Sequence, residues 1–164
     1  YKRTGCMDEF KTFRGYELQQ QKEGQFTPAM EDYLEMIYRL CQKQKFAKLN
    51  TLSKVLNVRP SSAFKMVSKL SHLGYLEYNL GGVIFLTPKG ERLGKYLNER
   101  HSTIFSFLSF IGSKKPLLET ELVEHLLSDD TIEKLKLLTS FFERNENIKN
   151  EFIKFMENSK RINF

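Results

Sequence analysis

The hydrophobic pattern of the chain begins with a helix predicted over residues 28–43. Thr27 and Pro28 form an N-cap and first-turn signal. Apolar side chains then recur at helical spacing on one face, at Met30, Leu34, Ile37 and Cys41. Asp32 and Glu35 are three residues apart, so they share a helix face beside that apolar stripe. Two acids in this position face either water or a cation, and the pattern leaves both interpretations open.

Two shorter helices joined by a tight turn are predicted next. The first covers residues 49–57, with Thr51 as its N-cap and an inner face of Leu52, Val55 and Leu56. The second covers residues 60–73 and ends at Gly74. Its inner positions are Ala63, Met66, Val67 and Leu70. Its other face offers hydroxyl groups, cations and one phenyl group, on Ser61, Ser62, Phe64, Lys65, Ser68 and Lys69. This arrangement predicts a helix-turn-helix.

A β-hairpin is predicted directly after the helix-turn-helix. Residues 75–79 and 83–87 are aromatic and β-branched runs around Leu80-Gly81-Gly82. Three helices followed by a hairpin form a winged helix. The tip carries no Lys or Arg, although a wing usually presents a basic side chain to DNA. Whether this wing contacts DNA is therefore left open.

The second half of the chain is predicted to be all helical and rich in Leu and Phe. Helices are expected over residues 88–110, 116–127, 130–143 and 147–158. Gly112 is the signal that stops the first of them. A helix cap is available from Ser128, Asp129 or Asp130. The excess of apolar surface predicts a dimerisation domain, and the alternative is a monomer that buries those faces internally.

The predicted fold class is mainly α, with two domains. A winged helix-turn-helix DNA-binding domain with a small β-hairpin wing covers residues 27–96, and an all-helical dimerisation and metal-binding domain covers residues 97–164. Residues 1–26 are a polar extension of mixed charge, either helical or disordered, whose role the sequence does not indicate.

Composition indicates a globular protein of the cytoplasm. Of the 164 residues, 40% are apolar and 28% are charged, and no apolar run approaches the length of a membrane span. The N-terminus shows no signal-peptide pattern. Cys6 and Cys41 occur in different settings and are not expected to pair, which favours a reduced compartment.

The net charge of +6 is confined to the middle of the chain. Residues 27–96 carry 11 basic and 5 acidic side chains, whereas residues 97–164 carry 10 and 11. A localised basic surface suggests a polyanion such as nucleic acid, although solubility alone also explains it.

A second group of candidate metal ligands lies in the helical half. Glu121, Glu124 and His125 are predicted on one side of a helix, and His101 stands on the long helix before it. Each residue alone is explained by an ordinary structural role. Together with the two acids near residue 30, they offer four carboxylates and two imidazoles, which suit Mn²⁺ or Fe²⁺. The absence of Cys argues against a thiolate-selected Zn²⁺ or Cu⁺ site.

Several short runs resemble the diphtheria-toxin-repressor family of metalloregulators, in particular its two-domain manganese transport regulators. The similar runs are Met30-Glu31-Asp32-Tyr33-Leu34-Glu35-Met36-Ile37-Tyr38, Arg59-Pro60-Ser61-Ser62, Lys65-Met66-Val67, Leu86-Thr87-Pro88-Lys89-Gly90, Arg100-His101 and Glu121-x-x-Glu124-His125. The resemblance covers residues 27 to about 145. It implies a Mn²⁺-responsive repressor that binds operator DNA as a metal-loaded homodimer and controls metal-uptake genes.

The resemblance also implies which residues bind the metal. The manganese-type ligands fall on Asp32, Glu35, His101, Glu121, Glu124 and His125, which would hold a pair of ions. The iron-responsive branch has Met at the position of Asp32 and Cys at the position of Glu121. Carboxylates at both positions favour Mn²⁺, while Fe²⁺ remains the alternative.

DNA recognition is expected from the helix over residues 60–73. Arg59, Ser61 and Ser62 stand at its start, where free backbone N–H groups favour phosphate, and Lys65 and Lys69 follow on its outer face. For Phe64 two roles are open. Its ring either contacts a thymine methyl group or folds back as a packing residue.

Two other classes of function compete with a metalloregulator. A winged-helix regulator that senses a non-metal ligand would leave the acids solvated. A dinuclear metal hydrolase would use two bridged ions to activate water. The sequence supplies neither a separate substrate pocket nor a general base, so no enzymatic activity is expected.

Overall fold

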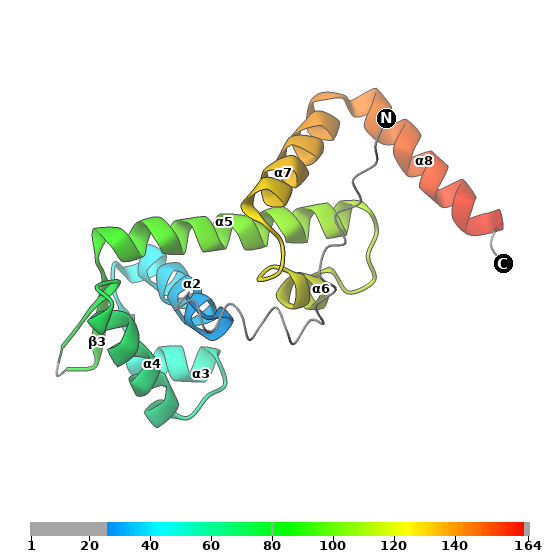
Figure 1. Cartoon of the computed structure of the whole chain (residues 1–164). Coiled ribbons are helices and arrows are strands. Elements are labelled where there is room, and N and C mark those ends of the chain that lie inside the picture. The colour runs from blue at the N-terminus through cyan, green and yellow to red at the C-terminus, as the bar shows by residue number, and fades with distance from the viewer. Residues whose placement is uncertain (1–25, 80, 163–164) are drawn as a thin grey trace, which may run out of the picture. The chain divides into compact units, whose positions relative to one another are not determined.

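The computed structural model describes residues 26–79 and 81–162, which form parts of two compact units. The first unit ends at Gly94 and the second begins at Lys95 (Figure 1). The predictions for residues 1–25 lie outside the described residues. None of the described helices is long and apolar enough to cross a membrane.

Helix α2 (Pro28–Gln44) begins and packs as its sequence predicts. The hydroxyl oxygen of Thr27 accepts a hydrogen bond from the backbone N–H of Met30 at 3.4 Å. Leu34 and Ile37 are fully buried, and Lys45 ends the helix in the left-handed conformation with φ 64°.

Helix α3 (Leu49–Val55) corrects two details of the prediction. Thr51 is not its N-cap, because the helix begins two residues earlier, after Lys48 in extended conformation. Val55 is 51% exposed, whereas Leu52 and Ser53 are buried. The apolar spacing of this short helix allows either of two sides to face the core. In the structure, the side that faces the core leaves Val55 exposed.

Helix α4 (Pro60–His72) follows α3 after a turn in which Asn57 has φ 53°. Ala63, Val67 and Leu70 are completely buried, as predicted, whereas Met66, the fourth predicted inner position, is only half-buried. Gly74, with φ 79°, follows the helix as expected for a C-terminal glycine. The two helices and their turn confirm the helix-turn-helix.

The small antiparallel sheet has three strands in the order β1-β3-β2. β2 (Leu76–Tyr78) and β3 (Val83–Leu86) form the predicted hairpin, in which Leu76 pairs with Leu86 and Tyr78 with Ile84. β1 (Ala47–Lys48) lies between the first two predicted helices and is a strand that the sequence analysis did not predict. Two residues are too short to show an alternating pattern.

Helix α5 (Pro88–Phe110) begins against the backbone of residue 75. The Thr87 hydroxyl accepts from the Gly90 N–H at 3.1 Å, and a Cβ at Gly90 would lie 2.0 Å from the Tyr75 carbonyl oxygen. Only glycine therefore fits at this first turn. Gly112, with φ 76°, follows the helix as predicted.

The second unit continues with α6 (Pro116–Val123), α7 (Asp129–Arg144) and α8 (Glu146–Ile162). The Ser128 hydroxyl caps α7 by accepting from the Thr131 N–H at 3.3 Å. Phe110, Phe142 and Phe152 pack together with ring centroids 4.8 to 5.6 Å apart, which joins the end of α5 to α7 and α8. The prediction of a mainly helical fold, with an N-terminal winged helix and an all-helical second half, is confirmed.

Candidate metal centre and nucleic-acid surface

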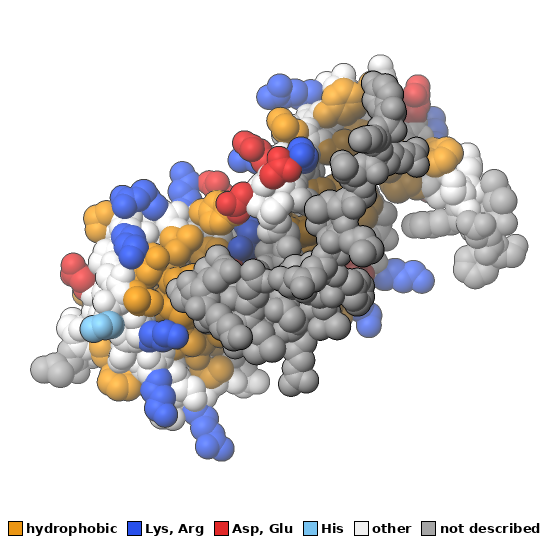
Figure 2. Space-filling model, viewed as in Figure 1, with side chains coloured by type: hydrophobic (Ala, Val, Ile, Leu, Met, Phe, Trp, Pro, Cys, Tyr) orange, Lys and Arg blue, Asp and Glu red, His pale blue; other side chains and the backbone are white. Residues whose placement is uncertain are grey.

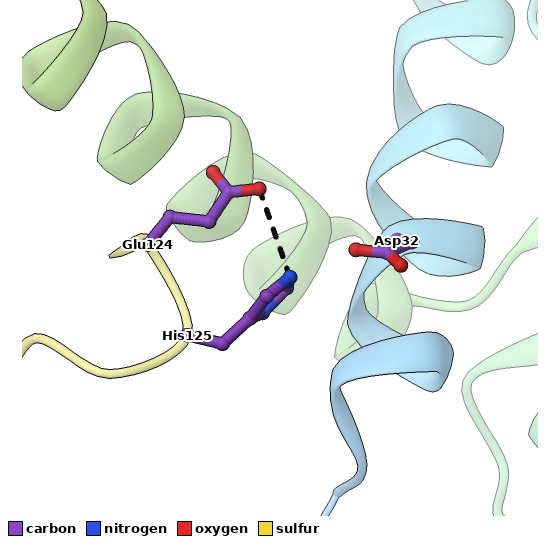
Figure 3. Close-up of side chains that lie close together, drawn as sticks. All are labelled: Asp32, Glu124 and His125. Atoms are coloured by element: carbon purple, nitrogen blue, oxygen red, sulfur yellow. Dashed lines mark ion pairs between the residues drawn. The ribbon is translucent and has the colours of Figure 1, made fainter. Parts of the chain in front are cut away.

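Four of the six predicted metal ligands come together within the second unit. His101 lies on α5 and Glu121 on α6, while Glu124 and His125 follow α6. The Nδ1 atom of His101 is 3.0 Å from Oε2 of Glu124 and 3.9 Å from Oε1 of Glu121. The Nε2 atom of His125 is 3.8 Å from Oε1 of Glu124, the ion pair that Figure 3 marks with a dashed line.

The local backbone differs from the predicted helix over residues 116–127. Helix α6 ends at Val123, and Glu124 is its C-cap with helical φ and ψ of −62° and −29°. His125 lies in the turn that follows, where the Leu126 N–H donates to the Val123 carbonyl oxygen at 2.9 Å. The capping Ser128 starts the next helix so soon that α6 cannot continue to residue 127. Glu124 and His125 are therefore presented by a turn and not by a helix face.

Glu124 is the centre of this group and is only 1% exposed. Each of its carboxylate oxygens faces an imidazole nitrogen, one from His101 and one from His125. Burial of a carboxylate is costly unless a donor or a cation compensates its charge. Arg100 adds a cation to the group, because its Nη2 donates to Nδ1 of His125 at 3.3 Å. The second unit thus builds a buried carboxylate beside the imidazole nitrogens of His101 and His125, and carboxylate oxygen and imidazole nitrogen are both metal-ligand types.

The two other predicted ligands, Asp32 and Glu35, belong to α2 of the first unit, and Figure 3 also draws Asp32 on that helix. Glu35 is buried, and its Oε1 accepts from Nη2 of Arg39, one turn later, at 2.5 Å. The acid on the apolar side of α2 is thus already paired with a cation, as expected for a buried carboxylate.

The predicted DNA-binding residues lie on the exposed side of α4. The side chains opposite the buried face are Arg59, Ser61, Ser62, Phe64, Lys65 and Lys69, all of them exposed. Arg59 is the N-cap and makes no side-chain capping bond. In Figure 2, Lys and Arg side chains gather over the region that α3 and α4 occupy in Figure 1. This face combines cations, hydroxyl groups and one exposed phenyl group.

One basic residue of the same surface was not singled out from the sequence. Lys54 is exposed on α3 and borders a hollow of about 410 Å³, whose other lining residues include Asn50, Asn57 and Pro60. The first helix of a helix-turn-helix crosses the DNA backbone. A basic residue on the outer side of that helix is therefore a candidate phosphate contact that the sequence could have indicated. Lys54 is such a residue.

Two family models match the chain, one over each half. Residues 25–81 match the N-terminal DNA-binding domain of iron-dependent repressors. Residues 87–152 match the metal-binding and dimerisation domain of the same proteins.

Curated relatives cover most of the chain. The HTH-type transcriptional regulator MntR of Listeria welshimeri is 41% identical over 136 residues, which are 82% of this chain and 95% of that protein. The MntR of Lysinibacillus sphaericus is 40% identical over the same length and coverage.

Solved structures of metal-dependent regulators are similar in fold. The metal-dependent transcriptional regulator MtsR matches with a TM-score of 0.63 and 26% identity, over 70% of this chain and 54% of that one. The manganese regulator SloR matches with a TM-score of 0.60 and 26% identity, over 68% and 54%. IdeR of T. acidophilum matches with a TM-score of 0.56 and 27% identity, over 70% and 52%. This chain therefore spans about half the length of these three solved proteins.

Proposed function

The chain belongs to the iron-dependent repressor family, whose members are transcriptional repressors and not enzymes, and from this premise we propose that it is a Mn²⁺-responsive repressor of metal-uptake genes. It has the DNA-binding domain and the metal-binding and dimerisation domain of that family. The observation that carries the metal proposal is the buried Glu124 carboxylate with the imidazoles of His101 and His125.

The proposed ligands are those that the sequence resemblance selects. They are Asp32, Glu35, His101, Glu121, Glu124 and His125. Carboxylate and imidazole donors without thiolate fit Mn²⁺, and their number is sufficient for a pair of ions. The name of the manganese regulator SloR and the name MntR of the curated relatives support the same metal.

Metal binding would replace the partners that these ligands have in the protein alone. Arg39 neutralises Glu35, and the imidazoles of His101 and His125 face the carboxylate of Glu124. Arg100 donates to the ring of His125. Divalent ions, when bound, supply concentrated positive charge that neutralises the carboxylates. The acids among the proposed ligands would then be neutralised by the metal in place of their present partners.

DNA and a second copy of the chain are the proposed partners. A homodimer presents two recognition helices to the two half-sites of an operator. By linkage, metal raises DNA affinity by the same factor as DNA raises metal affinity. Lys54 joins Arg59, Lys65 and Lys69 as a proposed phosphate contact. A repressor of this kind would act in the cytoplasm, where the DNA is.

Fe²⁺ is the alternative metal, and the description of the matching family as iron-dependent favours it. Mn²⁺ is preferred because Asp32 and Glu121 are carboxylates at positions where the iron branch carries Met and Cys.

Calorimetric titration of the metal-free protein with Mn²⁺ tests the proposal. Wild type is expected to bind two ions per protomer. Glu124→Gln is expected to weaken or abolish binding of at least one of them, because an amide oxygen carries no charge. Glu119→Gln removes an exposed acid of α6 outside the ligand set and serves as the matched control. Equal Mn²⁺ stoichiometry and affinity in wild type and Glu124→Gln would contradict the proposed centre.

A further inference from the structure

Phe64 is an exception on the outer face of the recognition helix α4. Its side chain is 48% exposed, although the neighbouring outward positions carry hydroxyl or basic groups. Exposure of a phenyl group to water on such a face is unfavourable relative to its burial. Its surface becomes favourable when a partner with an apolar group covers it.

Tyr78 of β2 holds the Phe64 ring from one side. The two ring centroids are 5.9 Å apart with an interplanar angle of 66°, an edge-on contact. Such aromatic contacts are favourable beyond the area they bury. Phe64 therefore packs against the wing and still presents apolar surface to solvent. Of the two roles left open by the sequence, packing is only part of the answer.

The surroundings of Phe64 select the kind of partner. Lys65 and Lys69 are also exposed on α4, and Arg59 is the exposed N-cap that precedes the helix. Charged residues are depleted at the cores of protein–protein interfaces, so this face does not suit a protein partner. An exposed side that combines cations with one apolar group suits a polyanion that also offers an apolar group. In the major groove, which admits an α-helix, duplex DNA offers the methyl group of thymine.

We propose that Phe64 reads the 5-methyl group of a thymine in each half-site of the operator, with Tyr78 as the residue that positions its ring. This inference rests on the proposed DNA-binding function and names one feature of the operator, a thymine methyl group, that the protein would recognise. Because Tyr78 restricts the ring before binding, less side-chain freedom is lost when the methyl group is contacted.

The expected size of the effect follows from burial of one methyl group. It corresponds to about a four-fold change in the dissociation constant per half-site. A symmetric operator changed in both half-sites would bind about sixteen-fold more weakly. These changes are large enough to measure by fluorescence anisotropy.

The test uses a duplex selected from a random-sequence library by the wild-type protein with Mn²⁺. Each thymine of the selected duplex is replaced in turn by deoxyuridine, which removes only the 5-methyl group. Wild type is expected to bind more weakly when one particular thymine per half-site is replaced. Phe64→Ala is expected to bind the thymine and deoxyuridine duplexes equally well.

Phe85→Ala is the matched control, because Phe85 is also a phenyl group, 40% exposed and beside another aromatic ring, Phe46, but lies on β3. This variant should keep the wild-type preference for thymine. The inference is overturned if wild type tolerates every replacement, or if Phe64→Ala retains the preference. If the library yields no enriched sequence at all, the proposed function as a sequence-specific repressor fails, and the inference fails with it. If an enriched duplex is obtained but the replacements have no effect, the inference alone fails.

Discussion

Cys41 is a buried thiol on α2, and its environment makes it a weak acid. Burial raises its pKa to about 11, with a further contribution from the negative charge of Glu91. The thiolate is the reactive form, so the thiol should be inert at neutral pH. The sequence predicted the buried position of Cys41 from helical spacing, and its depth in the structure explains the low acidity.

Alkylation by iodoacetamide in a Cys6→Ser background measures this effect, because Cys41 is then the only thiol in the chain. In the folded protein the alkylation rate should rise with pH toward a midpoint near 11. The pKa is higher in the folded state, so the thiolate is disfavoured there, and unfolding in urea should return the midpoint to the ordinary value of 9.0. Equal midpoints in the folded and unfolded protein would contradict this description of the α2 core.

Gly90 is the residue on which the start of α5 depends. A Cβ there would lie 2.0 Å from the carbonyl oxygen of Tyr75 and 2.9 Å from its carbon, both of them backbone atoms. Gly90→Ala should therefore lower the free energy of unfolding by about 1–3 kcal/mol. Urea denaturation measures the change. Gly81→Ala is the comparison, because its Cβ would meet only the Asn79 side chain at 3.3 Å, and a destabilisation as large as that of Gly90→Ala would contradict the steric argument.

At the scale of elements, α4 and α6 show what hydrophobic periodicity can and cannot predict. Its apolar spacing predicted the buried face of Ala63, Val67 and Leu70 correctly, because a single helical stripe faces the core. The same periodicity could not locate the end of α6. Residues 116–127 continue a helical pattern, but the Ser128 cap and the turn before it end the helix at Val123. Turn geometry at Glu124 and His125 is set by this competition between neighbouring helices, which spacing alone does not reveal.

Lys65 and Lys69 on α4 are expected to neutralise DNA phosphates. The double variant Lys65→Ala, Lys69→Ala should bind DNA more weakly, and its logarithmic salt slope should fall by about 0.9 for each phosphate that is no longer neutralised. Anisotropy titrations over a range of salt concentrations measure the slope. Lys134→Ala with Lys136→Ala removes the same charge from α7, where both residues are exposed, and should leave the slope unchanged. A wild-type slope in the α4 variant would exclude these lysines from the DNA-binding surface.

At the scale of the whole molecule, the sequence indicated more about chemistry than about assembly. Ligand types and short motifs selected the four residues that the second unit brings together around Glu124. They included Arg100 beside His101 but did not indicate that its guanidinium group contacts His125, nor that Arg39 pairs with Glu35, because spacing alone does not predict these contacts. The charge distribution did place the basic excess in residues 27–96, and three of these basic residues, Arg59, Lys65 and Lys69, are exposed at the start and on the outer face of α4.

Control of DNA affinity by metal occupancy is the central claim for the whole molecule. Both units carry predicted ligands, and the described part of the first unit contains the helix-turn-helix. We propose that binding of metal to ligands from both units orders the DNA-binding helix, and reciprocal linkage follows from this proposal.

Fluorescence anisotropy on the library-selected duplex tests this claim most directly, with the same protein measured in Mn²⁺, in Fe²⁺ under anaerobic conditions, in Zn²⁺ and in chelator. Mn²⁺ is expected to tighten specific binding at least ten-fold over chelator, which corresponds to a coupling free energy of about 1.4 kcal/mol. Fe²⁺ is expected to have a smaller effect. Equal affinity with Mn²⁺ and with chelator, at the same ionic strength, would contradict the claim that the chain is a metal-responsive repressor.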